Sequence, residues 1–331
     1  MLSSSSAASS RADVGSAAAA YILPLRTESL HGLDELTSYL DSLHGLQVIV
    51  VDGSPPAIFS EHARRWGVRV WHMPPRPHIS GRNGKVRGVL TGLAVSTHDK
   101  VIIADDDVRY DSDALAAVLA ALDRYDVVRP QNYFLSLPWH AVCDTARTLL
   151  NRVSGGDWPG TLGVRRRALL DGYDADVLFE NLELENTVIA NGGRALVAYD
   201  VYVGRRAPTT KQFWSQRVRQ AYDEFARPHR LAAALAVVPA VGMSMAGRRY
   251  KALLVAAILC MVGAEAGRRK AGGHRYFPAL ASVAAPVWVL ERGLCAWIAL
   301  LLKVGFGGVR YGEARIAKAA SAVKELRARR P

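Results

Sequence analysis

Three consecutive acids, Asp105, Asp106 and Asp107, follow a short apolar run at residues 101–104. Such a run is typical of a strand buried on both faces, as in a parallel sheet. Open α/β sheets bind ligands at the carboxyl ends of their strands, where three neighbouring carboxylates would repel one another unless a cation lay among them. Mg2+ and Mn2+ prefer hard oxygen ligands and can bridge to the phosphates of a nucleotide. The sequence therefore predicts a metal site at Asp105 and Asp107.

A second explanation for the acids is that they only begin the next helix. Asp111 or Ser112 precedes an amphipathic segment with apolar residues at 115, 118, 119 and 122, and either residue can cap that helix. Because capping does not require the triplet, we favour metal binding, although an acidic triplet is a short motif.

Two further polar residues, Asp52 and Lys85, stand at the ends of predicted elements. Asp52 ends an apolar run at residues 46–51, where it can accept hydrogen bonds from a ligand over the sheet; an Asp-Gly turn explains the position equally well. Lys85 begins a predicted helix, against the dipole preference, so a bound anion would compensate it. The segment is not a P-loop, because the spacing of glycines and the Ser or Thr after the lysine are absent.

Glu180 and Glu183 lie one turn apart at the start of a predicted helix at residues 179–190 and can point the same way. A carboxylate there can take a proton from a hydroxyl group. The alternative is that both are solvated acids of the first turn, favoured by the helix dipole.

Another helix is predicted at residues 211–225, with Trp214 on its buried face and Gln216, Arg217 and Arg219 on the others. The planar fork of arginine suits a diphosphate, but a helix facing solvent or lipid headgroups fits the pattern equally well. Trp158 is a candidate for stacking on an acceptor, although such a residue more often belongs to a core or anchors a loop.

Alternating strands and helices must position these residues. The pattern of strand, helix and strand begins a βαβ series, which predicts an α/β sheet. The predicted strands are residues 21–25, 46–51, 68–71, 101–104 and 126–129, with a strand or loop at 161–166.

The composition changes at residue 230, after which nearly uncharged runs alternate with basic clusters. Each run is shorter than the ~20 residues of a spanning helix, so the runs fit interfacial helices or spans joined across their breaks. A buried helical bundle is the alternative, but the flanking basic residues fit anionic headgroups better. The runs are residues 231–246, 252–266, 277–290 and 294–306.

The net charge of +12 and the pI near 9.8 favour an anionic partner. Much of this charge flanks the apolar runs, and no basic and aromatic residues interleave on the predicted sheet, so a nucleic acid is not expected. The cysteines, Cys143, Cys260 and Cys295, have no metal-site spacing and are predicted to be reduced packing thiols. The first twenty residues lack the pattern of a secretory signal and are predicted to be a disordered leader.

The segments VIVVDGS, GKVRGVLTGLAVSTHDKVIIADDD, FENLELE and QRVRQ, in this order, resemble family 2 glycosyltransferases of the GT-A fold between residues 21 and 227. The resemblance implies that Asp52 binds the nucleotide base, that Lys85 and Asp106 lie at the donor, and that Asp105 and Asp107 hold the metal and the diphosphate. It also implies donor or acceptor contacts by the QRVRQ segment.

This chain departs from the family pattern at three places. Asn181 stands where the second acid of a Glu-Asp pair is expected, QRVRQ lacks the usual tryptophan, and VDGS lacks a second aspartate. Since an amide cannot accept the proton, Glu180 is the first choice for the general base and Glu183 the second, with Asp176 next.

The resemblance thus implies a glycosyltransferase of the hexosyltransferase class that moves a sugar, with inversion and with Mg2+ or Mn2+, from a nucleotide-diphosphate sugar to a hydroxyl of a lipid-linked or cell-envelope acceptor. We expect a leader at residues 1–19, a GT-A domain at 20–228, membrane helices at 229–308 and a basic cytoplasmic tail at 309–331. Because the basic tail should remain with the catalytic domain on the cytoplasmic face of the inner membrane, we expect an even number of spans, in contact with membrane lipids. The alternatives are an inactive, membrane-tethered scaffold and, less favoured, a sugar-nucleotide pyrophosphorylase.

Overall fold

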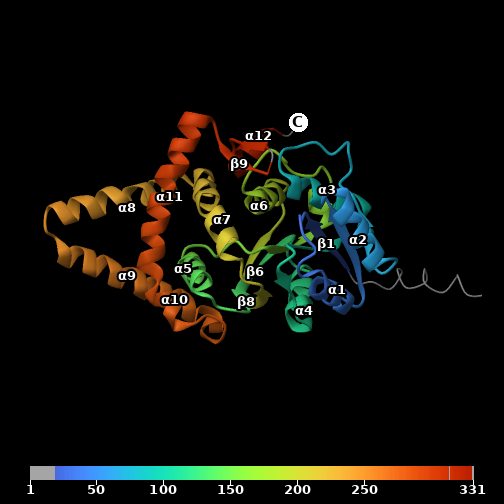
Figure 1. The fold of residues 1–331 in the computed structure, drawn as a ribbon, viewed down its shortest axis with the longest axis horizontal. Coiled ribbons are helices and arrows are strands. Elements are labelled where there is room, and N and C mark those ends of the chain that lie inside the picture. The colour runs from blue at the N-terminus through green and yellow to red at the C-terminus, as the bar shows by residue number, and fades with distance from the viewer. Residues whose placement is uncertain (1–18, 313, 330–331) are drawn as a thin grey trace, which may run out of the picture.

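Buried strands form the centre of the molecule. The computed structural model describes residues 19–312 and 314–329, in which an eight-stranded sheet has the order β3-β2-β1-β4-β7-β6-β8-β5 (Figure 1). β1, β2, β3 and β4 are parallel, whereas β7 runs antiparallel to both β4 and β6, so the sheet is mixed. The strands are β1 (Ala19–Leu25), β2 (Leu46–Asp52), β3 (Trp71–Met73), β4 (Lys100–Ala104), β5 (Val108–Arg109), β6 (Val127–Phe134), β7 (Thr161–Arg165) and β8 (Ala195–Arg205).

Helices cover both faces of this sheet, because alternate side chains of a strand point to opposite sides. Tyr21 and Leu23 of β1 pack in one apolar cluster, and Ala20 and Ile22 pack in another. The prediction of an α/β fold with strands buried on both faces is therefore confirmed. The helices of this part are α1 (Leu33–Ser42), α2 (Pro56–Trp66), α3 (Gly84–Val95), α4 (Ser112–Ala121), α5 (Trp139–Val153), α6 (Glu180–Ala190) and α7 (Thr210–Tyr222).

The acidic triplet, residues 105–107, does not cap the helix that follows it. Asp111 caps α4 by accepting a hydrogen bond of 2.8 Å from the backbone N–H of Ala114. Asn83 caps α3 in the same manner through the N–H groups of Lys85 and Val86. Capping of α4 therefore does not explain why the chain has three acids at residues 105–107.

The segment after residue 227 contains a projecting hairpin and a packed helix. Figure 1 shows α8 (Pro228–Ala246) and α9 (Tyr250–Arg269) extending together away from the sheet, with α11 (Ala285–Phe306) between them and the α/β part. The first two predicted apolar runs are α8 and α9. The other two meet in α10 (Ala279–Val283) and α11, and α11 continues without a break through Glu291 and Arg292.

The last segment packs against α6 instead of standing free. It contains β9 (Val309–Tyr311), β10 (Ala314–Ile316) and α12 (Val323–Ala328). The buried carboxylate of Glu183 accepts hydrogen bonds from the backbone N–H and the hydroxyl of Ser321, and Asn186 donates to the carbonyl of Ser321 at 2.8 Å. The predicted leader falls largely on residues 1–18, outside the described residues.

Candidate active site

The carboxyl edge of the sheet brings Lys85, Asp105 and Glu180 together. Nζ of Lys85, in the first turn of α3, lies 2.6 Å from Oδ1 of Asp105 and 2.8 Å from Oε1 of Glu180. Burial alone would lower the pKa of the Lys85 amine, but the two carboxylates outweigh it and raise that pKa well above its usual value. Lys85 is therefore a permanent cation between two acids at this edge.

Arg205, at the end of β8, is the second cation beside the acidic triplet. Its Nε lies 2.7 Å from Oδ2 of Asp107, and its Nη2 lies 4.0 Å from Oδ2 of Asp105. The repulsion between these acids is thus relieved by protein side chains, so repulsion alone does not demand a metal. However, Oδ1 of Asp107 is buried and, among the described residues, has no hydrogen-bond partner. A buried carboxylate oxygen without a partner fits a hard divalent cation.

Gly160 closes over the acids from the neighbouring loop. Its carbonyl accepts a 2.8 Å hydrogen bond from the N–H of Asp105, and a Cβ atom at this position would lie 2.9 Å from Oδ2 of Asp105. Any larger residue would crowd the carboxylate, so the glycine permits the close approach of this backbone.

Asp106 points to the other side of the triplet. It lines a small cavity of about 40 Å3 together with Thr27, His31 and Arg206. Burial, with the charges of Asp107 and Asp105, raises the pKa of the Asp106 carboxyl.

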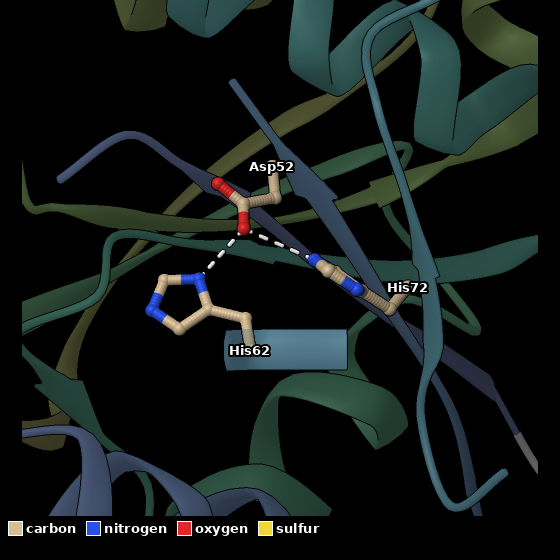
Figure 2. A group of neighbouring side chains, drawn as sticks. All are labelled: Asp52, His62 and His72. Carbon is tan, nitrogen blue, oxygen red and sulfur yellow. Dashed lines mark hydrogen bonds and ion pairs between the residues drawn. The ribbon is translucent and has the colours of Figure 1, made fainter. Parts of the chain in front are cut away.

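Asp52 lies in a buried network with two histidines (Figure 2). Nδ1 of His62 and Nε2 of His72 both donate to Oδ2 of Asp52, at 2.7 and 3.0 Å, and the N–H of Ser54 donates to Oδ1 at 2.9 Å. Burial opposes ionisation, but these hydrogen bonds outweigh it and hold the pKa of Asp52 well below its usual range.

Asp52, His62 and His72 have possible metal-ligating atoms within 4.8 Å of one another, so they form a candidate metal site in the described chain. Their mutual hydrogen bonds already satisfy the facing atoms of Asp52, His62 and His72, so we interpret the cluster as a network that fixes the end of β2. The contact between Asp52 and a nucleobase stays a prediction.

A cavity of about 160 Å3 opens beside Asp105 and Glu180 and extends to α7 and α11. Trp158 lies on its wall, edge-on to Phe179 at a centroid distance of 5.0 Å and beneath the guanidinium of Arg129 at 3.8 Å. The lining residues comprise Lys85, Asp105, Arg147, Asn151, Trp158, Pro159, Gly160, Phe179, Glu180, Asn181, Arg205, Gln216, Gln220, Asp223, Glu224, Arg227, Trp288 and Arg292.

Asn181, which stands where an acid was expected, has a structural partner. Its side-chain N–H donates to the carbonyl of Pro159 at 2.9 Å, which ties α6 to the loop that carries Trp158. The amide thus holds the wall of the cavity, while Glu180, one residue earlier, provides the carboxylate.

The remaining predicted residues separate into those at the cavity and those elsewhere. Gln216 lines it, whereas Arg217 is buried, forms a 3.0 Å ion pair with Asp144 and does not line it. Arg219 stacks on Tyr311, also away from the cavity. Glu183 accepts only from the last segment of the chain, as described above.

Arg217 is absent from the cavity because the buried face of α7 differs from the predicted one. The predicted buried face contained Trp214, but Trp214 is 55% exposed, whereas Phe213 and Arg217 are buried. That expectation was wrong by one residue, because an arginine paired with a buried aspartate can occupy a core position that hydrophobic periodicity assigns to an apolar residue.

Six charged lining residues have no counterpart among the predictions: Arg147, Arg205, Asp223, Glu224, Arg227 and Arg292. Asp223 is the most unusual, because its Oδ1 is buried without a hydrogen-bond partner among the described residues. Burial, helped by the charge of Glu180, raises the pKa of Asp223 well above its usual value. The available sequence signals were the acidic pair after QRVRQ and the polar interruption at Glu291 and Arg292 in an apolar helix.

No protein-family model matches the chain, and no curated protein sequence matches it. Among solved structures, it is similar to the mannosyltransferase PcManGT from Pyrobaculum calidifontis in complex with GDP-Man and Mn2+, at 18% identity over 87% of this chain and 79% of that one, with a TM-score of 0.47. It is also similar to glucosyl-3-phosphoglycerate synthase from Mycobacterium tuberculosis, in complex with Mn2+, UDP and glucosyl-3-phosphoglycerate, at 17% identity, over 63% and 80% of the chains, with a TM-score of 0.40.

A third similar structure is mannosyl-3-phosphoglycerate synthase from Rubrobacter xylanophilus, at 16% identity over 62% of this chain and 72% of that one, with a TM-score of 0.41. These names describe those proteins. At such identities and scores, the function of this chain must be argued from its own residues.

Proposed function

We propose that this protein is a metal-dependent glycosyltransferase that moves a sugar from a nucleotide-diphosphate sugar to an acceptor hydroxyl group. The observation that carries the proposal is the cluster of Lys85, Asp105, Asp107, Glu180 and Arg205 at the carboxyl edge of the sheet, beside a cavity large enough for a small group. This arrangement combines anion-binding cations, metal-binding acids and a carboxylate base.

Asp105 and Asp107 would hold Mg2+ or Mn2+, and Oδ1 of Asp107 is the oxygen most ready to do so. The metal supplies positive charge for the departing diphosphate. Lys85 and Arg205 would then exchange part of their contact with these acids for the donor phosphates, a role that the resemblance had given to Arg217 and Arg219. Asp106 would face the nucleoside side of the donor from the smaller cavity.

Glu180 is our general base, because it lines the cavity and is held by Lys85 at 2.8 Å. It would take the proton of the acceptor hydroxyl as the oxygen attacks the anomeric carbon from the face opposite the diphosphate, which inverts that carbon. Asp223 lines the same cavity and is the second candidate; it ranks behind Glu180 because its raised pKa favours the neutral form, which cannot take a proton. Glu183 is buried and bound to Ser321, which gives no support for a role as base.

We propose membrane attachment through α8 and α9. These helices are long and apolar enough to cross a membrane by length and composition. Most of α8 is exposed or half-buried, and Ala234 is its one buried residue. Leu254 and Leu259 of α9 are 62% and 64% exposed. A hairpin whose two ends return to the α/β part agrees with an even number of spans and with a cytoplasmic catalytic face at the inner membrane.

A catalytically inactive, membrane-tethered scaffold is the second candidate function. The observation that favours it is Asn181, which replaces an expected acid and is already bound to Pro159. An inactive scaffold would bind a nucleotide sugar without ever cleaving it.

The deciding experiment uses detergent-purified full-length protein and a panel of nucleotide sugars with Mg2+ or Mn2+. One donor should raise the melting temperature, because a ligand that binds only the folded state stabilises it. The same donor should be slowly hydrolysed, releasing nucleoside diphosphate. Stabilisation without any hydrolysis or transfer would support the scaffold, and no stabilisation by any donor would contradict both functions.

A further inference from the structure

We propose that the acceptor carries a phosphate group and that Arg292 of α11 binds this phosphate in the larger cavity. The inference rests on the proposed function and names the class of acceptor. Arg292 is 5% exposed and lines the cavity. Its Nε and Nη1 atoms have no hydrogen-bond partner among the described residues, and its Nη2 reaches only Oε1 of Gln220, at 3.4 Å.

Besides this long hydrogen bond, the guanidinium of Arg292 lies 5.3 Å from the centroid of the Trp288 ring. Such weak contacts leave a buried charge costly, because its desolvation is repaid only by good hydrogen bonds or an opposite charge. Other buried or half-buried arginines in the described chain have such compensation; Arg129, whose Nε and Nη1 also lack hydrogen-bond partners, lies 3.4 Å from the carboxylate of Glu185. Arg147, in the same cavity, has ion pairs with Asp144 and Asp157, and Arg152 donates to the carbonyl of Gly267 and the side chain of Gln131. Arg292 differs from these three, which indicates that an anion completes its site.

The nearby acids compensate Arg292 only in part, because the charges of Glu291 and Glu224 do not outweigh its burial, which lowers the pKa of the guanidinium. Glu224 forms its ion pairs with Arg227 and Arg230, at 3.0 and 3.2 Å, and Glu291 forms no ion pair with Arg292 in the described chain. Burial raises the pKa of Asp223, which favours its neutral form. The cavity therefore has an excess of positive charge near α11.

A phosphate monoester matches the excess positive charge near α11 better than a single carboxylate does. Among the described residues, Nε of Arg227 also lacks a hydrogen-bond partner. Two guanidinium groups, of Arg227 and Arg292, and the side-chain amide of Gln220 therefore line the same cavity. Arginine forks bind phosphate oxygens in pairs, and a phosphate monoester can satisfy two such groups at once. This site belongs to α11 and the end of α7, and is distinct from Asp105 and Asp107, which would hold the donor diphosphate.

The phosphate could come from a lipid or from a soluble acceptor. α11 also carries exposed apolar residues such as Leu290 and Leu294, 44% and 57% exposed, close in sequence to Arg292. The chemistry recognised by Arg292 is the same in either case, so the experiment below separates the two sources.

The test uses full-length protein whose donor site is first saturated with Mg2+ and the nucleoside diphosphate that stabilises it most. Inorganic phosphate is then titrated, with binding followed by calorimetry. Wild type should bind phosphate saturably, and Arg292→Gln should bind it about 10 to 100-fold more weakly, as expected for charged hydrogen bonds. Arg167→Gln, which changes an exposed arginine outside the cavity, should bind like wild type.

Folding and donor binding are controlled separately. Without phosphate, Arg292→Gln should melt no lower than wild type, since it removes an uncompensated buried charge, and it should still bind nucleoside diphosphate with Mg2+. Should this variant not fold, Arg227→Gln and the wild-type titration decide. No saturable phosphate binding by wild type, or equal binding by Arg292→Gln, would overturn the inference, and intact donor hydrolysis in that case would leave the proposed function standing.

The source of the phosphate is found with two organic probes in detergent. A short-chain lysophosphatidic acid carries both a phosphate monoester and a free hydroxyl. If it binds more tightly than glycerol phosphate, and loses this advantage as the phosphate-free monoacylglycerol, the acceptor is a lipid. Equal binding of both phosphates identifies a soluble acceptor. If neither phosphate binds and the monoacylglycerol alone does, the phosphate proposal is wrong.

Discussion

At the scale of single residues, Glu180 and Asp223 compete for the role of general base. Both line the larger cavity, but Glu180 is held by Lys85, whereas an oxygen of Asp223 has no hydrogen-bond partner in the described chain. We expect Glu180→Gln to retain donor binding and to lose transfer by ~10^2 to 10^4-fold, the range typical of a missing general base. Transfer assays and donor calorimetry on the same preparation measure this.

Asp223→Asn is the matched comparison and should lose much less transfer than Glu180→Gln. Glu183→Gln should transfer at the rate of wild type, because Glu183 contacts Ser321 and not the cavity. A large loss in Asp223→Asn with full activity in Glu180→Gln would reverse our assignment.

Asp52 allows a prediction about pH. Its folded-state pKa lies below the ordinary value of about 3.9, so its ionised form contributes stability above that value, and the contribution disappears as the pH falls through the folded pKa. Asp52→Asn should therefore cost most near pH 7, and the difference from wild type should shrink below about pH 4. Urea unfolding at pH 7, 5 and 3 measures the difference; a constant difference would show that the carboxylate charge is unimportant there.

Other residue positions could not be inferred from the sequence. Lys85, Asp105 and Glu180 were singled out beforehand, and the structure brings them into contact. The position of Arg292 depends on how α11 packs against α7, a long-range arrangement that no local pattern specifies. The same limit explains Arg217, which hydrophobic periodicity could not assign to the core.

At the scale of elements, strong patterns predicted the strands β1, β2 and β4 nearly to the residue, because continuous apolar runs are typical of buried strands. The strand predicted at residues 68–71 is instead β3, at Trp71–Met73. The last segment is predicted only as a basic cytoplasmic tail, with no structure of its own, and it packs on α6 through Ser321. Its apolar residues are mostly alanines without a clear period, and its attachment combines the buried Glu183 with Val309, Ile316 and Ala319, which pack in an apolar cluster.

This attachment predicts an effect on stability without an effect on chemistry. Glu183→Ala leaves the N–H of Ser321 buried without an acceptor, which should cost about 1 to 3 kcal/mol. Thermal or urea unfolding measures the loss. Transfer per folded molecule should remain unchanged, and a variant of normal stability with reduced transfer would contradict this structural role.

At the scale of the whole molecule, the projecting hairpin of α8 and α9 is the feature that the sheet does not explain. Apolar side chains that cover a helix on all sides require a lipid or protein environment. Leu254→Arg combined with Leu259→Arg should greatly reduce binding to vesicles that contain anionic lipids, without lowering the melting temperature, since both residues are exposed. Vesicle sedimentation of the purified variants measures this.

Leu170→Arg is the control, because Leu170 is 72% exposed but belongs to the α/β part. It should bind vesicles like wild type. Unchanged vesicle binding by the double variant, together with a change from dimer to monomer in gel filtration, would identify a second copy of the chain as the cover of the hairpin.

The account depends most on one claim, that the acids after β4 hold a divalent cation together with the donor diphosphate. Calorimetric titration of the stabilising nucleotide sugar, with and without Mn2+, tests it in wild type, Asp107→Asn and Asp111→Asn, the last of which should preserve the cap of α4. We predict that Mn2+ strengthens donor binding in wild type and Asp111→Asn and has no effect in Asp107→Asn, which lacks the charged oxygen ligand. Equal dependence on Mn2+ in Asp107→Asn and wild type would contradict the claim.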